Sequence, residues 1–576
     1  MDKFDELSTL RHTTSHIMAQ AVLRLYPGTH IAIGPAIENG FYYDFDTATP
    51  FTSEDLEKIE AEMKKIVKEN LKIERFELPR AEALELMKDQ PYKVELINDL
   101  PEGETISFYR QGEFTDLCAG PNLNYTAKVK AFKLLKTAGA YWRGNEKNKM
   151  LQRIYGTAFK TKDELNQYLE QLEEAKKRDH NKIGRDLKYF TTCDVVGQGL
   201  PLLMPKGAKT IQILQRFVED EEERRGYVLT KTPYMAKSDL YKMSGHWDHY
   251  QEGMFLLKSE NEEDVMALRP MTCPFQFMIY NNDLHSYRDL PIRYGETSTL
   301  FRNEASGEMH GLTRVRQFTL AEGHIVCTPE QLEDEFRGVM NLIDFVMDKL
   351  GIREDIWYRF SKWDPNNTDK YINDPEAWEK TQSIMKTILD HLGIEYIEAE
   401  GEAAFYGPKL DIQSRNVHGK EDTLITVQID FLLAERLGMT YVDKDNEKKH
   451  PYIIHRSSLG CYERTLAMLL EKYAGALPLW IAPEQVRVLP ISQAQTEYCT
   501  QLENTLRENK IRVSVDGRNE KIGYRIREAQ LEKIPYMLVI GDKEIENHEV
   551  AVRSREEGDL GTMTMDAFLE RIKKEL

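Results

Sequence analysis

The segment LFRNEASGEMHGLTRVRQFTLAEGH, residues 300–324, places many charged side chains between two runs that have the composition of β-strands. Gly307 and Gly311 lie in the polar connection, which predicts an antiparallel hairpin with a long loop. Guanidinium groups bind phosphate, an aromatic ring stacks on a base, and a carboxylate accepts from an exocyclic amine, so one face of this hairpin could bind a nucleotide. The alternative is a sheet whose polar face simply meets water. Because side chains alternate along a strand, the residues expected on that face are Arg302, Glu304, Arg314, Arg316, Phe318, Leu320, Glu322 and His324.

Histidine and cysteine side chains elsewhere in the chain could also take part in chemistry. An amphipathic helix is predicted near the N-terminus, stops at Pro27, and puts His12 and His16 one turn apart on one face. Cys273 directly precedes Pro274, a favoured first helical residue, and a thiol at a helix N-terminus has a lowered pKa. Taken alone, each feature has a simpler explanation: a buried inert cysteine, and two exposed histidines on a helix.

Length, charge and cysteine content restrict the class of protein. A chain of 576 residues is too long for one hydrophobic core, which predicts about three or four domains. Six scattered cysteines do not form the pattern of a disulfide framework. The sequence contains no long apolar run and no leader-like N-terminus, so we expect a cytoplasmic protein without a membrane partner. A net charge of −19 disfavours a generally basic surface for nucleic acid, although local patches can still attract an anion.

Predicted elements divide the chain into four regions. Residues 1–160 are expected to form a mixed α+β domain that includes a charged helix near 53–70. The highly charged segment 161–188 is predicted to be a helical linker. Strands rich in β-branched and aromatic residues alternate with helices over 189–478, the largest domain. A β-α-β alternation over 479–576 predicts a small sheet with helical crossovers.

Three segments together resemble the signature motifs of class II aminoacyl-tRNA synthetases. FRNE, a loop and RVRQF resemble motif 2; LGCYERTLAMLLE, 459–471, resembles motif 3, a helix entered with Arg464. ERRGYVLTKTPYM, 223–235, resembles motif 1, which ends at Pro233 and forms the dimer interface of that class. The resemblance implies an α+β multidomain protein with an antiparallel-sheet catalytic core, an N-terminal α+β editing-type domain and a C-terminal α/β anticodon-binding domain. It also implies a homodimer joined through motif 1.

Within that class, RPMTCP, the GH that follows motif 2 and the IHR that precedes motif 3 are similar to the zinc-ligand segments of threonyl-tRNA synthetases. The similarity implies that Cys273, His324 and His455 bind one Zn2+ per subunit. One cysteine and two histidines leave a coordination position open, as in catalytic zinc sites. Threonine and valine are nearly isosteric, and an apolar pocket separates such a pair by only about a hundredfold. A metal that takes both the amino group and the hydroxyl excludes valine but admits serine.

The family reaction implies roles for the remaining pocket residues. Threonine attacks the α-phosphate of ATP to give an adenylate, and the 3'-terminal ribose of tRNA(Thr) then takes the acyl group. Such chemistry needs positioning and charge neutralisation more than a nucleophilic side chain. We expect Arg302 and Arg464 to be the catalytic residues that hold phosphates with Mg2+, with Arg314 contributing. Phe318 and Glu304 are expected to hold the adenine. The segments FYGPK and VQIDF add Tyr406, Lys409, Gln428 and Asp430 as substrate-pocket residues, with Gln428 also near ATP.

Residues 1–160 resemble the editing domain of this family in HTTSH, GFYYDF and TDLCAGP. Because serine also satisfies a zinc-based selection, such an enzyme needs a second, hydrolytic site. The family's tetrad is His-x-x-x-His with Cys-x-x-x-His, and here it is His12, His16, Cys118 and Asn122. Asn122 cannot titrate as imidazole does. Two interpretations follow: weakened editing through His16 and Cys118 with water held by Asn122, or a domain kept for tRNA docking. We expect reduced editing of seryl-tRNA(Thr).

The sequence departs from the family pattern in the substrate pocket as well. Leu320 replaces a glutamine and Glu322 replaces an aspartate in FTLAEGH, which changes the expected threonine contacts. Glu322 remains a substrate-binding residue in this interpretation. The similarity begins almost at the first residue, so the ubiquitin-like domain that often precedes the editing domain is not expected.

Residues 479–576 resemble the anticodon-binding domain of several class II synthetases. Lys521, Arg525 and Arg527 are expected to form a basic patch for the RNA backbone, although a solvated helix face is the simpler explanation for each one. Side chains that hydrogen-bond the splayed bases of an anticodon are expected at Asn519, Glu544 and Arg553.

Two alternatives to threonine activation remain at this point. One is a class II synthetase for another amino acid, such as proline, which has no reason to keep the cysteine and two histidines. The other is a non-catalytic paralogue that binds RNA, which has no reason to keep Arg302 and Arg464. The expected partners are therefore tRNA(Thr), L-threonine and ATP.

Overall fold

The computed structural model describes residues 6–145, 147–257 and 265–576. The chain divides into two compact units, Met1–Glu174 and Ala175–Leu576. Their boundary falls inside helix α5 (Lys162–Arg178), within the segment predicted as a linker. None of the helices in the described ranges combines the length and apolar character that a bilayer crossing requires.

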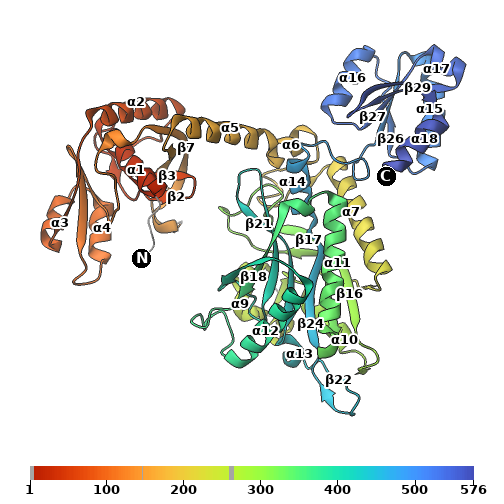
Figure 1. Ribbon diagram of the computed structural model, residues 1–576, viewed down its shortest axis with the longest axis horizontal. Helices are drawn as coiled ribbons and strands as arrows, with labels where there is room; N and C mark the ends of the chain where they lie inside the picture. The colour runs from red at the N-terminus through yellow and green to blue at the C-terminus, as the bar shows by residue number, and fades with distance from the viewer. Residues whose placement is uncertain (1–5, 146, 258–264) are drawn as a thin grey trace. The chain divides into compact units, whose positions relative to one another are not determined.

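The first unit has a sheet covered by two helices. Its strands are β1 (His30–Ile31), β2 (Ala36–Ile37), β3 (Gly40–Asp46), β7 (Ala131–Tyr141) and β8 (Met150–Phe159), in the order β1-β3-β8-β7 with β2 beside β3. Helix α1 (Glu6–Leu25) contacts β3 and β8 through buried side chains that include Ile17 and Val22. Helix α2 (Ser53–Glu69) begins with a capping box between Thr52 and Asp55 and packs on α1 and β7 (Figure 1). The predicted helix near 53–70 is therefore present.

A second, smaller sheet completes this unit and positions a cysteine. Strands β4 (Ile73–Leu78), β5 (Ile106–Gln111) and β6 (Phe114–Leu117) are antiparallel neighbours in that order. Helices α3 (Arg80–Leu86) and α4 (Pro91–Asp99) lie between β4 and β5 in sequence. Cys118 follows the last residue of β6, so the strand fixes where its thiol emerges.

The second unit is built on an eight-stranded sheet. Its order is β11 (Val228–Leu229), β16 (Ile292–Phe301), β17 (Gln317–Cys327), β24 (Tyr452–Cys461), β21 (Glu421–Asp430), β20 (Lys409–Arg415), β18 (Ile356–Lys362) and β19 (Tyr396–Glu400). All pairs are antiparallel except the two at the edges. Strands β16 and β17 form the predicted hairpin, and their connection, residues 302–316, is its long loop.

Helices cover this sheet and enclose the main core. They are α7 (Pro205–Arg224), α11 (Leu332–Leu350), α12 (Pro375–Leu392) and α14 (Tyr462–Lys472). Helix α11 packs on β17 and β24, and α14 packs on the same two strands (Figure 1). Their apolar faces, with residues such as Phe336, Ile343 and Leu466, are fully buried against Ile325 and Ile454 of the sheet. This core holds β17 and β24 rigidly in register.

Shorter elements surround the sheet. In chain order they are α6 (His180–Asp186), β9 (Phe190–Thr191), β10 (Leu202–Leu203), β12 (Met235–Lys237), α8 (Ser238–Met243), α9 (His246–Tyr250), β13 (Leu256–Leu257), β14 (Met266–Leu268), α10 (Cys273–Tyr280), β15 (His285–Ser286), α13 (Leu433–Arg436), β22 (Tyr441–Val442) and β23 (Lys448–Lys449). Among them, α9 and α10 carry side chains to the site described next.

The C-terminal region forms a separate five-stranded sheet. The order is β26 (Val513–Val515), β25 (Val486–Pro490), β27 (Tyr536–Ile540), β28 (Glu549–Ser554) and β29 (Gly558–Thr564). The first three strands are parallel and the last two antiparallel. Its helices are α15 (Thr496–Glu508), α16 (Ile522–Leu531), α17 (Asp542–Asn547) and α18 (Met565–Lys574). The predicted β-α-β alternation is present, and β29 and α18 are additions that the pattern did not indicate.

Candidate metal centre and adjoining sites

Three side chains from distant parts of the sequence meet in the second unit. Cys273 begins α10, His324 lies in β17, and His455 lies in β24 directly opposite His324 in the strand register. All three are buried, and one ligand atom from each lies within 4.8 Å of the others. The predicted ligands are therefore brought together.

Neighbouring side chains hold both histidine rings in place. Gln276 Oε1 lies 2.5 Å from His324 Nδ1, and Asp430 Oδ2 lies 2.8 Å from His455 Nε2. Such partners fix the orientation of metal-binding imidazoles and leave the other ring nitrogen for the ion. The donor set of one thiolate and two imidazoles suits Zn2+, so the residues fit the implied metal.

Asp430, predicted as a substrate-pocket residue, contacts one of the three clustered side chains. Its Oδ1 accepts from the backbone N–H groups of Leu432 and Leu433, while its Oδ2 faces His455. The carboxylate is completely buried. Asp430 is therefore placed to orient the His455 ring.

The thiol of Cys273 also differs from expectation. Burial, followed by the nearby carboxylates of Glu322 and Asp430, raises the pKa of Cys273 well above its ordinary value. The prediction that the helix N-terminus lowers this pKa is thus wrong for the protein's own groups. A divalent cation bound by this thiol would supply the positive charge that a thiolate requires here.

One wall of this centre has an unsatisfied acceptor. Glu322 is buried, and its Oε1 has no hydrogen-bond partner among the described residues. A β-bulge falls between Ala321 and Glu322, where β17 pairs with β24. Burial raises the pKa of the Glu322 carboxyl above its ordinary value. An orphaned buried acceptor is costly unless a ligand uses it, so this wall suits a hydrogen-bond donor on a small molecule.

The opposite wall carries the other predicted pocket residues. The Tyr406 ring stacks on His455 with centroids 4.6 Å apart, and its hydroxyl donates to Gln428 Oε1 at 2.7 Å. Lys409 is partly buried and forms an ion pair with Asp411 at 2.8 Å. Tyr406 and Gln428 thus border the metal centre directly.

Sequence reasoning missed two residues of the centre. His246, at the start of α9, is buried with Nε2 3.8 Å from Cys273 Sγ. Nothing in its spacing connects it with the ligands. Gln276 is one helical turn beyond Cys273, a spacing that could have indicated a shared helix face.

The side chains predicted to bind the nucleotide lie in or next to the long loop of the same hairpin. The Arg302 guanidinium carbon lies 5.1 Å from the centroid of the buried Phe318 ring. Arg464, in the first turn of α14, donates from Nε to Thr313 O at 3.0 Å. Glu304 forms an ion pair with Arg314 at 2.8 Å. Arg302 and Arg464 thus each lie against the β16–β17 hairpin, Arg302 at Phe318 and Arg464 at Thr313.

The alternating pattern predicted that the strand begins earlier than it does, and so it placed loop residues on the pocket face. Strand β17 begins at Gln317, so Arg314 and Arg316 lie in the loop and not on the sheet. Arg316 donates to the backbone oxygen of Glu304, which closes the base of the loop. Leu320 packs beside Phe318 and Cys461 and makes this part of the face apolar.

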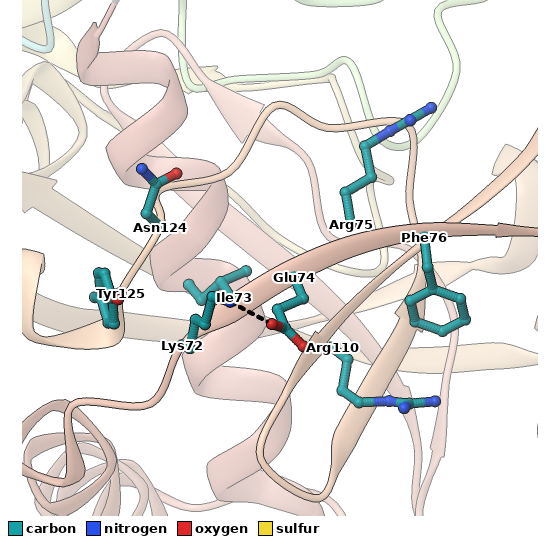
Figure 2. Close-up of a pocket in the computed structure, with 8 residues that line it drawn as sticks. All are labelled: Lys72, Ile73, Glu74, Arg75, Phe76, Arg110, Asn124 and Tyr125. Atoms are coloured by element: carbon teal, nitrogen blue, oxygen red, sulfur yellow. Dashed lines mark ion pairs between the residues drawn. The ribbon is translucent and has the colours of Figure 1, made fainter.

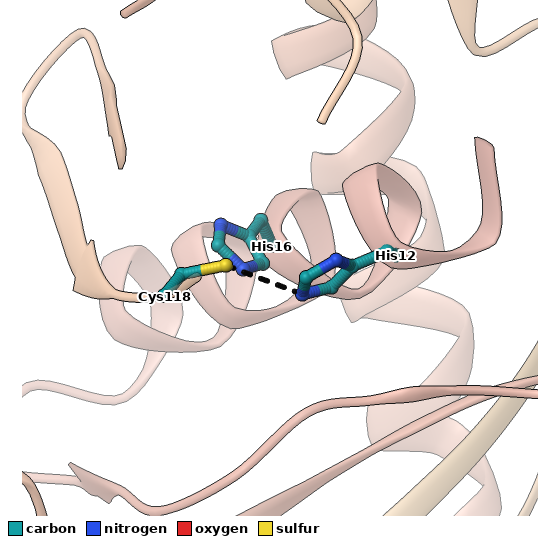
Figure 3. Close-up of side chains that lie close together, drawn as sticks. All are labelled: His12, His16 and Cys118. Carbon is teal, nitrogen blue, oxygen red and sulfur yellow. Dashed lines mark hydrogen bonds between the residues drawn. The ribbon is translucent and has the colours of Figure 1, made fainter. Parts of the chain in front are cut away.

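The first unit contains a second cluster of two histidines and a cysteine. His12 and His16 lie one turn apart on α1 with ring centroids 5.0 Å apart. Figure 3 shows Cys118 facing them, with Sγ 3.4 Å from His12 Nε2. His16 is buried, so the alternative of two exposed histidines is wrong. One ligand atom from each of the three lies within 4.8 Å of the others, as in the second unit.

Asn122 is fixed beside this cluster. Its Oδ1 accepts from Thr13 Oγ1 at 3.1 Å, and its Nδ2 lies 3.6 Å from Cys118 Sγ. Burial, followed by the carboxylate of Asp116, raises the pKa of Cys118 to about 11. Burial lowers the pKa of His12. At neutral pH the pair is therefore a thiol beside a neutral imidazole, which suits a general base more than a thiolate nucleophile.

A buried ion pair supports this cluster. Asp116 is 2.6 Å from Lys93 Nζ, accepts from the Tyr43 hydroxyl at 2.5 Å, and lies 3.7 Å from His16 Nε2. These four residues come from four elements, so no sequence spacing could have linked them. Burial opposes the charge on Asp116, but Lys93 and His16 outweigh it and lower its pKa.

A groove of about 700 Å³ lies on the small sheet of this unit. Its lining residues are Lys72, Ile73, Glu74, Arg75, Phe76, Arg110, Asn124 and Tyr125 (Figure 2). Three cations and one carboxylate line it; Lys72 pairs with Glu74, and Arg75 pairs with Glu77. Arg110 lies 4.7 Å from the centroid of Phe76, and the Tyr125 ring is exposed. Positive charge beside aromatic rings is typical of surfaces that bind single-stranded nucleic acid.

The predicted anticodon residues come from a loop, a helix and an inner strand of the C-terminal region. Asn519 is exposed before α16, Glu544 accepts from Gly541 N–H within α17, and Arg553 in β28 pairs with Asp559. The predicted basic patch needs correction, because Arg525 is buried and donates to the backbone oxygens of Pro490, Asp516 and Glu520. Only Lys521 and Arg527 of that set are exposed.

An antiparallel sheet that carries the β16–β17 hairpin, with Arg302 beside Phe318 and Arg464 against Thr313 of its loop, defines the catalytic core of a class II aminoacyl-tRNA synthetase. Residues 255–473 match the tRNA synthetase class II core domain (G, H, P, S and T) and residues 485–575 match the anticodon binding domain. Residues 106–155 match the threonyl and alanyl tRNA synthetase second additional domain. The chain belongs to the threonine–tRNA ligase family.

Similar proteins support this placement over the whole chain. A threonine–tRNA ligase of Clostridium botulinum (strain Eklund 17B / Type B) is 69% identical over 576 residues, which cover 100% of this chain and 90% of that protein. One from Clostridium perfringens (strain 13 / Type A) is 69% identical over 98% of this chain and 88% of its own length. Among solved structures, the RNA binding domain of threonyl-tRNA synthetase from Cryptosporidium parvum Iowa II aligns with a TM-score of 0.65 at 34% identity, covering 69% of this chain and 98% of that one.

Proposed function

We propose that this protein ligates L-threonine to tRNA(Thr) with ATP, by way of threonyl-adenylate. The observation that carries the proposal is the buried Cys273, His324 and His455 set beside the orphaned acceptor of Glu322. Threonine has a hydroxyl that can donate to such an acceptor, whereas proline and valine have no side-chain donor. This favours threonine over the proline alternative, and the family membership argues in the same direction.

The reaction has two balanced steps. A carboxylate oxygen of threonine attacks the α-phosphorus of ATP, and pyrophosphate leaves. A 3'-terminal ribose hydroxyl of tRNA then attacks the acyl carbon, and AMP leaves. Arg302 and Arg464 are proposed to neutralise the phosphates together with Mg2+, while Phe318 holds the adenine ring.

The remaining nucleotide contacts require a rearrangement of side chains. Glu304 is proposed to accept from the adenine amine and Arg314 to reach a phosphate. Their mutual ion pair must open for either contact, and such an exposed pair costs little to break. Gln428, with Tyr406 and Lys409, completes the threonine side of the pocket.

The implied metal is one Zn2+ per subunit. When bound, Zn2+ supplies a Lewis-acid position that can take both the amino group and the hydroxyl of threonine. Gln276 and Asp430 keep the two imidazoles turned toward that position. Serine carries the same two groups, so the metal does not exclude it.

An amino-acid-dependent ATP–pyrophosphate exchange panel tests the main proposal. Purified protein is assayed with threonine, serine, valine and proline, and its zinc content is measured by elemental mass spectrometry. We expect exchange with threonine, weaker exchange with serine, none with valine or proline, and about one zinc per chain. Full activity in metal-free protein, or exchange that depends on proline, would contradict it.

We further propose that the first unit hydrolyses seryl-tRNA(Thr) at a reduced rate. His12, whose pKa is lowered by burial, is proposed as the general base, and Asn122 offers an amide where the family has an imidazole. The groove beside Asn124 and Tyr125 is proposed to take the single-stranded 3' end of the tRNA. Deacylation of seryl-tRNA(Thr) by the whole protein, with Cys118→Ala as the control, measures this activity.

The assembly and location follow from the same proposal. Motif 1 exposes several apolar side chains to solvent. Leu229 is 70% exposed and Val228 is 52% exposed, and Tyr234 and Met235 are exposed to a smaller extent. Exposed apolar patches of this kind mark protein interfaces, so we propose a homodimer through motif 1. Asn519, Glu544 and Arg553 are proposed to read the anticodon, and the cytoplasm is the proposed compartment. Light scattering of the protein, with Leu229→Glu as the variant, tests the dimer.

A further inference from the structure

The tip of the motif 2 loop is held at two adjacent residues by side chains from outside the loop. Arg464 donates from Nε to the backbone oxygen of Thr313 at 3.0 Å. The backbone N–H of Leu312 donates to His180 Nε2 at 3.2 Å. Arg464 belongs to motif 3, whereas His180 is the first residue of α6, in the segment that precedes the catalytic region. The second contact has no part in the proposed reaction.

The ring of His180 is fixed on every side. It is completely buried, and Nδ1 lies 2.7 Å from Glu471 Oε1 in the last turn of α14. Because Nε2 accepts from the Leu312 N–H, the Nδ1 side of the ring is the donor to Glu471. Glu471 is itself held, since its Oε2 accepts from Val417 N–H at 3.2 Å. Phe190 stacks beside the ring with centroids 6.4 Å apart.

The loop closes directly on this ring at Gly311. Its φ is +49°, a conformation that L side chains rarely adopt. A Cβ at this position would lie 2.1 Å from His180 Nε2 and 2.5 Å from Asn181 Oδ1. Only glycine therefore lets the backbone approach closely enough for the Leu312 N–H to reach the imidazole.

The two anchors differ in whether ATP can remove them. The Arg464 guanidinium also donates from Nη1 to Thr423 O, so both of its contacts are to backbone oxygens. Under the proposed function it binds the phosphates, and an N–H that binds phosphate no longer holds Thr313 O. His180 is buried and already satisfied by Glu471, so bound ATP leaves it unchanged. When Arg464 leaves the loop, the neighbouring peptide stays attached through His180.

We infer that His180 is a positioning residue for ATP binding: it anchors the motif 2 loop at Leu312 while Arg464 is engaged with the phosphates. This inference rests on the proposed role of Arg464. The inferred role of His180, which lies outside the three signature motifs, affects the affinity for ATP. It does not affect the affinity for threonine or for the metal.

Two isosteric substitutions separate the two bonds of the ring. In His180→Asn the side-chain amide takes the place of Nδ1 and keeps the bond to Glu471, but nothing reaches Leu312. In His180→Gln the longer side chain brings an oxygen acceptor to the place of Nε2. Threonine-dependent ATP–pyrophosphate exchange is measured with each substrate varied, together with zinc content and the melting temperature.

We expect His180→Asn to raise the KM for ATP about tenfold, the effect of one neutral hydrogen bond, and His180→Gln to raise it about twofold. The KM for threonine and the zinc content stay unchanged in both variants. An equal rise in the two variants, an unchanged KM for ATP, or parallel losses for both substrates would overturn the inference. A general packing defect lowers the melting temperature but does not select ATP.

Gly311 tests the same contact from the side of the loop, in case the buried variants do not fold. Gly311→Ala is expected to raise the KM for ATP at least as much as His180→Asn. Gly307→Ala is the matched control, because no atom lies within 4 Å of a Cβ there and its φ is not positive. Equal KM values for ATP in the two alanine variants would contradict the inference.

Arg464→Ala distinguishes a failure of the proposed site from a failure of this inference. If Arg464→Ala keeps full exchange, the proposed phosphate role is wrong, and the explanation for the second anchor falls with it. If Arg464→Ala is inactive while His180→Asn matches the native enzyme, the site stands and only the inference is overturned.

Discussion

The two units each contain a cluster of two histidines and one cysteine, but the neighbours of these clusters differ. Around Cys273, His324 and His455, the nearest polar groups are the carboxylates of Asp430 and Glu322 and the amide oxygen of Gln276, all of which favour a cation. Around His12, His16 and Cys118, the carboxylate of Asp116 already pairs with Lys93 and Tyr43. The donor atoms are the same in both, so the neighbours decide whether a cluster suits a metal or acid–base chemistry.

The largest expected effect comes from the same substitution made in each cluster. Cys273→Ser removes a thiolate ligand, so we expect loss of zinc and a decrease in threonine-dependent exchange of about a thousandfold or more. Cys118→Ser should leave exchange within about twofold, because that cluster does not serve activation. Zinc content and pyrophosphate exchange are measured on both proteins. Comparable losses in both would end the distinction between the clusters.

The supporting carboxylates form a second matched pair. Asp430→Asn is expected to weaken zinc binding about 10- to 100-fold, because a neutral amide orients and polarises His455 less well. Asp116→Asn should leave zinc untouched and destabilise the first unit, since it leaves the buried Lys93 without its counter-charge. Competition with a chromophoric chelator gives the zinc affinity, and limited proteolysis gives the stability. Zinc loss in Asp116→Asn would be the contrary result.

Replacing Asn122 by the histidine of the family tests the proposed acid–base role of the cluster in the first unit. Asn122→His places a titratable ring near the thiol of Cys118, and we expect about a tenfold faster deacylation of seryl-tRNA(Thr). Threonine-dependent exchange should stay the same, which serves as the internal control. If deacylation is no faster than in the native chain, the asparagine is not what limits editing.

The smallest expected effect is a pH dependence of the stability of the first unit. Burial lowers the pKa of His16 to about 3, against 6.5 for the free side chain. Between these values the unfolded chain binds more protons, so stability rises with pH and is lost as the pH falls below 6.5. At pH 6 the loss from this residue is about 1 kcal/mol.

Hydrogen exchange of the α1 amides, corrected for intrinsic rates, measures this loss in the whole protein. His16→Gln should reduce the difference between pH 7 and pH 6, because the substituted side chain does not titrate. A native α1 whose protection is equal at the two pH values would contradict the predicted sign and size.

The sequence predicted the hairpin and the three ligands, and the reasons lie in local pattern and family resemblance. Strand alternation correctly placed Phe318, Glu322 and His324 on one face. It failed at Arg314 and Arg316, because polar loop residues can continue an alternating pattern after the strand has ended. The partners of the ligands, Gln276 and Asp430, could not be assigned their roles, since those depend on packing between segments that are distant in sequence.

Arg525 shows the same limit in the C-terminal sheet. Helical spacing placed it beside Lys521, which suggested a surface cation. In the structure three backbone oxygens surround its guanidinium group, and a periodicity of hydrophobic and charged residues does not reveal such acceptors. The buried pair of Lys93 and Asp116 was missed for the same reason.

His324 pairs directly with His455, so the geometry of the metal pocket depends on the register between β17 and β24. Successive residues of a strand face opposite sides, so a one-residue deletion early in β24 would bring Arg456 into the place of His455. Arg456 now pairs with Glu222 on the reverse side. Its positive charge would repel any divalent ion, whereas insertions in the long connections between the strands leave this arrangement intact.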